Sequence, residues 1–366
     1  MFQKFKRFIK KILRHKRKPF KIIYPNESDP KIAVVPLNNI ENQPKIYTIQ
    51  KGRIDTDNLQ SDCYFIGRKL ISPITFSYSN GLTAASNNNI YKRYVNSKKP
   101  KNIDGVVFSL LCGGAPNRNY YHWLFDSIPK LELIKDARNK IDYFYVPSFY
   151  KQKFKKESLS YFNIIDEQII DSHEYPHIKT KKQIIACTHH NPGNPNNVPK
   201  WICSFLRKSF ITHDIFDESE IKKIYISREG ASCRRIINED LILSKLTCLG
   251  FKKFKLENIS FHDQITLFAN ADIVVAPHGA GLANIIFCKP GTKIVELMPS
   301  GHNLELFNNN RFFYLYQNIA RYMNLNYEMF TGTGLVNPTS NCFSRNDFFI
   351  NEQIIEKIIE IIWLKN

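Results

Sequence analysis

Long hydrophobic runs are missing from this sequence, as are most of the short motifs that identify an enzyme directly. No run of 18 or more apolar residues occurs, which excludes a membrane-spanning helix in this sequence. The GxSxG, HExxH, P-loop and EF-hand patterns are absent, so the hydrolases, zinc proteases, nucleoside triphosphatases and calcium proteins that they mark are not indicated. No recognised DNA-binding motif is present, and specific nucleic-acid binding is not expected.

Paired cysteines are also missing. The eight cysteines are scattered, and none forms a CxxC pair. This spacing argues against a structural zinc ribbon, and it favours free thiols in a reducing compartment.

Acidic residues are scarce compared with basic ones. The 366 residues include 52 Lys or Arg and 33 Asp or Glu, which gives a formal net charge of +19. A hydrophobic content of 43% excludes wholesale disorder, and the length corresponds to about two domains.

The first 18 residues hold nine of the basic side chains and no acid. Apolar residues recur there at helical spacing, which predicts a basic amphipathic helix at an anionic membrane surface. A solvated basic tail, or a tail that binds nucleic acid without specificity, remains the alternative. No secretory signal is indicated, because no apolar core follows the basic start.

Short apolar runs separated by polar turns predict an α/β protein. In the first half we expect strands at 31–35, 45–50, 63–66, 105–111, 141–146, 168–171 and 182–187, with helices at 120–137 and 149–162. In the second half we expect strands at 222–227, 251–256, 272–276 and 293–297, with helices at 201–213, 239–249, 260–268 and 281–287. Asn238 and Ser260 are predicted helix caps.

The segment 189–199 is rich in Pro, Gly and Asn, and it predicts a hinge. The expected organisation is a membrane-surface helix (1–18), a linker (19–30), a first Rossmann-like domain (31–195), a second Rossmann-like domain (196–345) and a C-terminal helix (346–366). Alternating strands and helices predict parallel sheets covered on both faces.

The strongest local motif is PHGAGLAN at 277–284, which follows an apolar strand and opens a helix. Ligands of open α/β sheets bind beyond the carboxyl ends of strands, and helix N-termini suit phosphate. Gly279 and Gly281 would let the backbone approach a ligand, and His278 could donate to a phosphate oxygen. An ordinary Gly-rich turn is the alternative.

Three arginines gather in the loop that follows the strand at 222–227: Arg228, Arg234 and Arg235. Arginine is suited to bidentate phosphate contacts. Surface ion pairs with Glu229 and Glu239 are the alternative.

Two further features suggest chemistry. His122 and Asp126 are four residues apart on a predicted helix, and a carboxylate beside an imidazole makes a candidate general base. Glu296, at the end of the strand KIVEL, is a candidate acceptor for a ribose diol. Each has a purely structural alternative.

Metal binding has weaker support. Asp55 and Asp57 flank one residue and could hold Mg²⁺ or Mn²⁺ with a diphosphate, but a turn is the favoured interpretation. The histidines at 173, 177, 189 and 190 are irregularly spaced and are not expected to form a metal site.

Three segments together carry a family resemblance: NYYHWLFDSIPKLEL (119–133), YISREGASCRRIINED (225–240) and ADIVVAPHGAGLANIIFCKPGTKIVEL (271–297). In this order and spacing they resemble glycosyltransferase family 61. The resemblance covers residues 105–325, and Ala283 stands where many members have Thr.

The resemblance implies a GT-B fold, with two Rossmann-like domains facing a central cleft. It also implies an inverting transfer without an essential metal or cofactor. The donor would be a nucleotide-sugar, expected as a UDP-sugar, held by Arg228, Arg234, Arg235, His278, Gly279, Gly281 and Asn284, with Glu296 near the ribose. His122 and Asp126 would lie near the acceptor.

The expected acceptor is a glycan or lipid-linked glycan of capsular or other surface polysaccharide. We expect the enzyme in the cytoplasm, peripheral at the cytoplasmic face of the inner membrane. Two alternatives remain open: a metal-dependent GT-A transferase that uses Asp55 and Asp57, and a non-catalytic nucleotide- or glycan-binding protein.

Overall fold

The structure is a computed structural model that describes residues 21–25, 30–57, 61–77, 88, 90, 99–111, 119–149, 152–188, 198–212, 215–216, 221–300, 315–335 and 346–363. The predicted helix at 1–18 and most of the predicted linker lie outside these residues. Within them no helix is both long enough and apolar enough to span a bilayer. The fold class is α/β, as predicted.

The chain divides into two compact units. One consists of Met1–Gln152 and Ile164–Pro192, and the other of Lys153–Asn163 and Gly193–Asn366. The short segment 153–163, which the sequence places in the first domain, therefore packs with the second unit.

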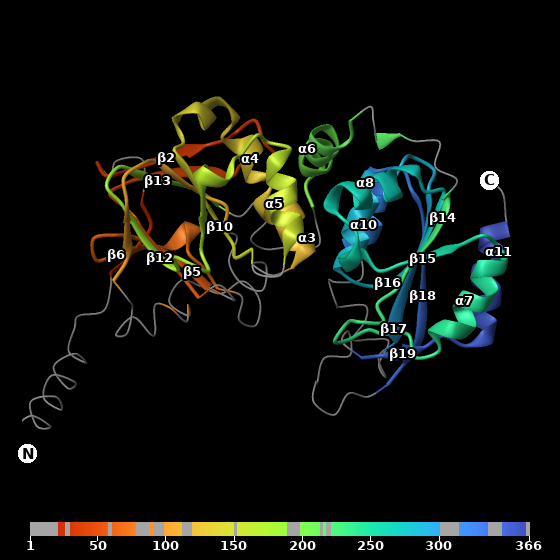
Figure 1. Ribbon diagram of the computed structural model, residues 1–366. Helices are drawn as coiled ribbons and strands as arrows, with labels where there is room; N and C mark the ends of the chain where they lie inside the picture. Colours follow the sequence, from red (N-terminus) through yellow and green to blue (C-terminus); the bar gives the residue numbers. More distant parts are fainter. Residues whose placement is uncertain are drawn as a thin grey trace, which may run out of the picture. The chain divides into compact units, whose positions relative to one another are not determined.

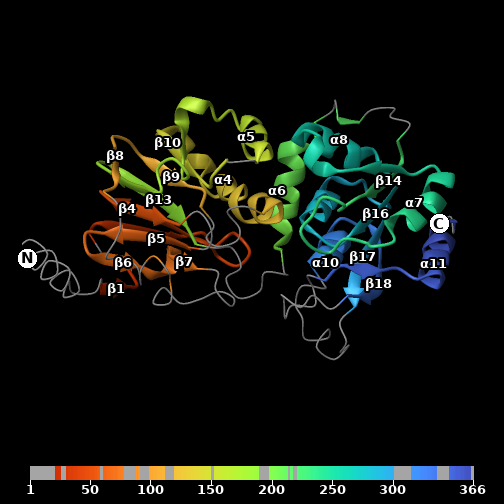
Figure 2. The same cartoon turned by 60° about the horizontal axis from the view of Figure 1, so that its bottom comes forward.

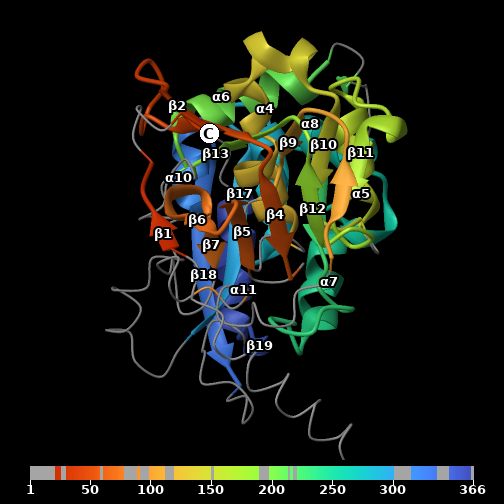
Figure 3. The ribbon, with the colours of Figure 1, turned by 90° about the vertical axis from the view of Figure 1, so that its left-hand side faces the viewer.

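The first unit contains two sheets. One has the order β1-β6-β5-β4-β12-β8, with β7 paired to β5, and Figure 3 shows most of these strands side by side. Its strands are β1 (Lys21–Ile23), β4 (Arg53–Thr56), β5 (Ser61–Ile66), β6 (Lys69–Ile71), β7 (Phe76–Ser77), β8 (Lys101–Ile103) and β12 (His177–Thr180). This mixed sheet was not predicted, because most of its strands are too short for a clear alternation of apolar and polar residues.

The other sheet has the order β11-β10-β9-β13-β3-β2. Its strands are β2 (Ile32–Pro36), β3 (Lys45–Gln50), β9 (Val107–Ser109), β10 (Tyr143–Val146), β11 (Ile169–Asp171) and β13 (Gln183–Cys187). The strands from β11 to β13 are parallel, whereas β3 and β2 add in antiparallel fashion. The predicted parallel arrangement is thus correct for only part of the first unit.

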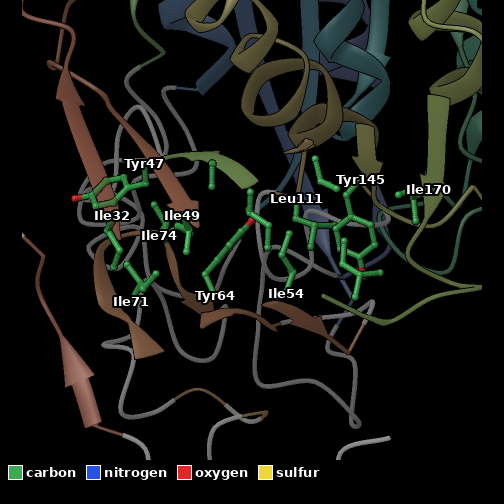
Figure 4. Close-up of a cluster of buried hydrophobic side chains, with 14 residues drawn as sticks. Ile32, Tyr47, Ile49, Ile54, Tyr64, Ile71, Ile74, Leu111, Tyr145 and Ile170 are labelled. Carbon is green, nitrogen blue, oxygen red and sulfur yellow. The ribbon is translucent and has the colours of Figure 1, made fainter. Parts of the chain in front are cut away.

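A shared core joins the two sheets. Ile54, Tyr64 and Ile71 come from the first sheet and pack in one buried cluster with Ile49 and Tyr145 of the second; Figure 4 shows these side chains. The Tyr64 hydroxyl also lies 2.7 Å from the Ser109 Oγ atom, so one buried hydrogen bond links β5 to β9.

The predicted helix at 120–137 is broken into pieces. They are α3 (Tyr120–His122), the π-helical turn η5 (Trp123–Ser127), α4 (Lys130–Leu133) and the 3₁₀-helix η6 (Lys135–Lys140). Pro129 has no N–H, and its ring would crowd the carbonyl of Phe125 in a regular α-helix. The wider turn closes instead through the Ile128 N–H, which donates to the Trp123 carbonyl. Two further 3₁₀-helices, η1 (Ser72–Ile74) and η7 (Asp166–Gln168), belong to the same unit.

The second unit is built on one sheet of order β15-β14-β16-β17-β18-β19, whose central strands follow one another in Figure 2. All neighbouring pairs are parallel except β18 with β19. The strands are β14 (Lys223–Ile226), β15 (Lys252–Phe254), β16 (Ile273–Pro277), β17 (Lys293–Ser300), β18 (Asn326–Gly334) and β19 (Phe348–Phe349).

Helices cover both faces of this sheet, as Figure 1 shows. On one face α7 (Glu239–Cys248) and α11 (Glu352–Trp363) bury Ile242, Leu246 and Ile358 against Val275 and Val295. The other face carries α8 (Phe261–Asn270), the 3₁₀-helix η10 (Ala280–Phe287) and α10 (Leu315–Tyr322), with α6 (Lys200–Phe210) against η10. A short 3₁₀-helix, η9 (Leu256–Asn258), precedes α8.

The segment α5 (Lys153–Ser160) packs on α8. The Glu157 carboxylate accepts from the Phe261 N–H at 2.7 Å, and the Tyr161 hydroxyl lies 2.9 Å from the Nδ1 atom of His262. A chain segment between β10 and β11 of the first unit is therefore fixed to the second.

The two predicted caps have different outcomes. The Ser260 Oγ atom accepts from the Asp263 N–H at 3.1 Å, which confirms it as the cap of α8. Asn238 makes no side-chain cap to α7. Instead, its Nδ2 atom donates to the Ile350 carbonyl at 2.7 Å, and its Oδ1 atom accepts from the Ile350 N–H at 3.1 Å.

Candidate functional site

The carboxyl ends of β14 and β16 bring the two main predicted motifs together. Arg228 follows β14 after one residue, and His278 and Gly279 follow β16 directly. Because β14 and β16 are parallel neighbours, both loops leave the sheet at the same edge, where open α/β sheets bind ligands.

Gly279 and Arg228 are in direct contact. A Cβ atom placed on Gly279 would lie 2.2 Å from the Nη1 atom of Arg228, which is far inside van der Waals distance. Only glycine therefore allows the guanidinium to lie against this turn. Gly281 has a similar but softer constraint, since its Cβ would lie 2.8 Å from the end of the Leu256 side chain.

Two arginines at this edge lack a carboxylate partner. Within the described chain neither Arg228 nor Arg234 forms an ion pair, and the Nε atom of each is buried without a hydrogen-bond partner. Arg228 donates from Nη2 to the Cys233 carbonyl at 3.1 Å. Burial, followed by the charge of Arg234, lowers the pKa of Arg228. Buried donors without partners are costly, so two such guanidinium groups favour an anionic ligand.

The loop is arranged so that Arg234 stays at the site. Arg234 has a φ of 60°, in the left-handed region that residues other than glycine seldom adopt. Arg235, the next residue, turns away: its Nε and Nη2 atoms both donate to the Asp347 carboxylate, at 2.9 and 2.6 Å. Arg235 was predicted to bind the donor, whereas in the structure its guanidinium anchors the loop.

A cavity adjoins these groups. Its volume is about 330 Å³, and its lining includes Arg228, Gly230, Leu256, Pro277 and Gly281. This volume is at the lower end of the range of small-molecule sites.

His278 is held by a buried carboxylate. Its Nδ1 atom is hydrogen-bonded to the Oε1 atom of Glu296, and the other oxygen of Glu296 accepts from the Tyr327 hydroxyl. Glu296 lies within β17, with 1% of its surface exposed. Burial and the charge of Glu296 raise the pKa of Tyr327 well above its ordinary value. Glu296 was predicted near a ribose, but both its oxygens are used inside the protein.

Tyr316 fixes the turn from the other side. Its hydroxyl donates to the Gly279 carbonyl at 2.6 Å, and its ring centroid lies 5.4 Å from that of His278. Burial, with the charge of Glu296, raises the pKa of Tyr316. Sequence analysis missed both tyrosines, because each is more than 30 residues from its partner and lies in no motif.

Asn284 was also predicted at the donor, but its amide is used inside the protein. It is fully buried, and its Nδ2 atom donates to the Gln264 Oε1 atom at 3.0 Å and to the Gly281 carbonyl at 3.1 Å. These bonds fix η10 to α8 and support the turn from behind.

The His122–Asp126 pair forms in the first unit as predicted. The Nδ1 atom of His122 lies 2.6 Å from the Oδ2 atom of Asp126, and their side chains are 19% and 7% exposed. The π-helical turn begins directly after His122 and contains Asp126; such turns recur at functional sites.

The pair Asp55 and Asp57 does not have the arrangement of a metal site. Arg53 donates to both oxygens of Asp55, at 2.6 and 2.7 Å, and Asp57 accepts from the Ser61 N–H at 2.8 Å. No cluster of three metal-ligating side chains occurs among the residues with described positions. His189 and His190 lie outside them, and the six cysteines inside them form no disulfide.

Known proteins match the part of the chain that contains these motifs. Residues 120–295 match the family model described as Glycosyltransferase 61. One relative is the EGF domain-specific O-linked N-acetylglucosamine transferase of Drosophila melanogaster, 28% identical over 124 residues, which are 33% of this chain and 22% of that protein.

A second relative is Protein O-linked-mannose beta-1,4-N-acetylglucosaminyltransferase 2 of Xenopus laevis, 39% identical over 75 residues, 20% of this chain and 13% of the relative. The chain thus aligns with less than a quarter of either protein. The region matched by the family model includes His122, Arg228 and His278 in the predicted order. Residues 120–295, just under half of the chain, are thus similar to glycosyltransferase family 61.

Proposed function

We propose that this protein transfers a sugar from a nucleotide-sugar to a hydroxyl group of a growing glycan. The observation that carries the proposal is the pair Arg228 and Arg234, without carboxylate partners, beside the Gly279 turn and its cavity. A nucleotide-sugar releases a nucleoside diphosphate, and this pair presents positive charge and N–H donors where such a group would lie.

The proposed donor is a UDP-sugar. Both relatives are named for N-acetylglucosamine transfer, so UDP-N-acetylglucosamine is the first sugar to test. The cavity lined by Leu256 and Pro277 would take the nucleoside, and the arginines would take the diphosphate. Glu296 and Asn284 would act behind this site rather than in contact with the donor.

The proposed reaction inverts the anomeric carbon and uses no metal. The acceptor oxygen attacks that carbon while its bond to the diphosphate oxygen breaks, and the electron pair leaves with the diphosphate. Arg228, Arg234 and backbone N–H groups would meet this charge; one well-placed donor typically contributes about 3–4 kcal/mol. His122, oriented by Asp126, would take the acceptor proton.

The GT-B arrangement and the cellular role are part of the same proposal. The two compact units would be the acceptor-side and donor-side domains of a GT-B enzyme. Residues 1–18 would hold the enzyme at an anionic cytoplasmic membrane surface, where a lipid-linked glycan of capsular or other surface polysaccharide is accessible. Of the two alternatives, the GT-A mechanism is disfavoured by the engagement of Asp55 with Arg53.

A thermal-shift panel tests the donor site. UDP, GDP, CMP and ADP are each added with EDTA and with Mn²⁺; a ligand at 100 times its Kd stabilises the native state by about 2.7 kcal/mol. We expect UDP to raise the Tm in EDTA. A response confined to Mn²⁺, or no response to any nucleotide, would contradict the proposal.

Matched variants locate the effect. Arg228→Ala should abolish the UDP-dependent shift, whereas Lys252→Ala should retain it, because Lys252 is exposed at the amino end of β15, at the opposite end of the parallel sheet. Equal loss in both variants would indicate that general basic charge, rather than this site, attracts the nucleotide.

A further inference from the structure

The environment of His278 limits which protonation states can bind an anion. Nδ1 is occupied by Glu296, and the hydrogen bonds that His278 makes to described residues use only Nδ1 and the backbone N–H, not the other ring nitrogen, Nε2. The side chain is 8% exposed, so a small part of its surface is open to a ligand. Nε2 is therefore the atom through which His278 can meet a ligand.

Proton counting shows what that contact requires. If the pair of His278 and Glu296 holds one proton, this proton lies between Nδ1 and Oε1, and Nε2 carries a lone pair that repels a phosphate oxygen. For Nε2 to donate a hydrogen bond, the pair must hold a second proton. This holds whether the shared proton is assigned to the imidazole or to the carboxyl group.

The neighbouring groups do not supply that second proton. Tyr327 already donates to the other oxygen of Glu296, and Tyr316 donates to the Gly279 carbonyl. Arg228 lies against the same turn, and Arg234 is near enough for its charge to act on Arg228 and Tyr316, so both favour an anion at this site. An incoming diphosphate would therefore favour proton uptake at His278.

We infer that Glu296 is a positioning residue that couples diphosphate binding to the uptake of one proton by the His278–Glu296 pair. The inference rests on the proposed donor site and adds a pH-dependent control of it. It explains why a carboxylate with 1% exposure lies behind a site for an anion: it compensates the charge that His278 acquires when the diphosphate binds.

The Cys233 thiol is a second group whose ionisation could make anion binding depend on pH. Burial alone would raise the pKa of Cys233, but the charge and hydrogen bond of Arg234, with the charge of Arg228, lower it overall. A Cys233 thiolate would also weaken anion binding as pH rises, so Cys233→Ser is the necessary control.

Isothermal titration calorimetry with UDP tests the inference. The full chain is titrated at pH 8, where free UDP is fully ionised, in two buffers of different ionisation enthalpy, and the difference gives the number of protons taken up. We expect the uptake to approach one proton per UDP bound, and the affinity for UDP to fall by up to about tenfold per pH unit between pH 7.5 and 9. Cys233→Ser should keep both properties.

Glu296→Gln should abolish the uptake. The amide nitrogen of the substituted side chain can donate to Nδ1 while the amide oxygen accepts from Tyr327, which leaves a neutral His278 with a proton on Nε2. UDP should then bind with little dependence on pH. If this variant does not fold, His278→Gln provides the same readout, since it retains a donor but cannot titrate.

The outcomes separate the two claims. No UDP binding at any pH overturns the proposed UDP site, and the inference with it. Binding without proton uptake in the unaltered protein, or uptake that persists in Glu296→Gln or His278→Gln, overturns only the inference. Uptake that disappears in Cys233→Ser assigns the linkage to the thiol and likewise overturns it.

Discussion

Gly279 shows how a single missing side chain determines where a charge lies. The Arg228 guanidinium occupies the space that a Cβ atom would need, and the Gly279 carbonyl is held by Tyr316. The backbone therefore has little freedom to move away from an added methyl group.

Gly279→Ala should displace Arg228 and weaken donor binding. We expect the KM for the donor to rise by about 10- to 100-fold, since a charge-assisted hydrogen bond contributes about 1.5–3 kcal/mol. Steady-state kinetics over a range of donor concentrations would measure this. Arg228→Ala is the matched variant, because it removes the guanidinium that Gly279→Ala would displace, and we expect a similar rise in KM. If both variants behave like the unaltered protein, Arg228 does not hold the donor.

His122→Ala should separate chemistry from binding. Loss of a general base typically lowers turnover by about 10²–10⁴, and His122 lies in the first unit while the proposed donor site lies in the second. We expect kcat to fall while the thermal shift by UDP persists. A loss of UDP binding would show that His122 is not the acceptor-side base.

At this scale the sequence indicates which candidate residues lie near one another better than it indicates how their side chains are oriented. Arg228, Gly279 and His278 follow strands, and their meeting was predictable from the parallel order. The partners of Glu296 were not predictable, because KIVEL is apolar on both faces and no alternation indicates the side to which the carboxylate points. The contact of Arg235 depends on Asp347, which is 112 residues away.

At the scale of elements, a buried carboxyl group on β5 of the first unit interacts electrostatically with a lysine on α4. Asp62 on β5 is buried, and burial raises its pKa to about 7, although the charge of Lys130 on α4 opposes the shift. The Lys130 ammonium donates to the Leu111 carbonyl, and Asp62 accepts from the Phe76 N–H at 3.0 Å. A sheet strand and the helix that follows the π-helical turn are thereby electrostatically linked.

This arrangement predicts a stability that decreases with pH. The folded state retains the Asp62 proton up to about pH 7, whereas the unfolded chain releases it near pH 4, so the native state binds more protons in between. The free energy of unfolding should fall as pH rises through this window. In the unaltered protein, Asp62 should lower the free energy of unfolding by on the order of 1–4 kcal/mol across this window. Asp62→Asn should remove this contribution and so flatten the pH dependence.

Urea unfolding at pH 5, 6 and 7.5 would measure the difference. Asp104→Asn, at a carboxylate that is 68% exposed, should leave the pH dependence unchanged. An Asp62→Asn profile that parallels that of the unaltered chain would contradict the assignment.

Elements with strong local signals were predicted correctly, and those that depend on distant pairing were not. Strands β14 and β16 are apolar runs bounded by turn residues, and Gly250 ends α7 with a φ of 83°. By contrast β12 pairs with β4 across more than 100 residues. The π-helical turn depends on how one proline is accommodated, which spacing alone does not determine.

For the whole molecule, the uneven charge of the sequence leads to a proposal about location. Each Lys or Arg close to an anionic bilayer contributes about 1 kcal/mol, so residues 1–18 would be sufficient for binding. Removing them should abolish co-sedimentation with vesicles that contain phosphatidylglycerol, without changing the UDP-dependent thermal shift.

The matched variant keeps the charge and removes the apolar face, with Phe2, Phe5 and Ile9 changed to Ser. Weakened binding there would support an amphipathic helix, whereas unchanged binding would favour a tail attracted by charge alone. Full recovery of the shortened chain with vesicles would contradict the proposal.

The position of α5 has a consequence for any attempt to divide the protein. The chain leaves the first unit after β10, contributes α5 to the second, and returns to form β11. The backbone therefore passes between the units three times, near residues 152, 163 and 192. Cleavage near residue 192 would leave α5 on the amino-terminal fragment and its partner α8 on the other. The fragments would remain associated after the cut, so a nicked enzyme can elute as one species and show two bands only after denaturation.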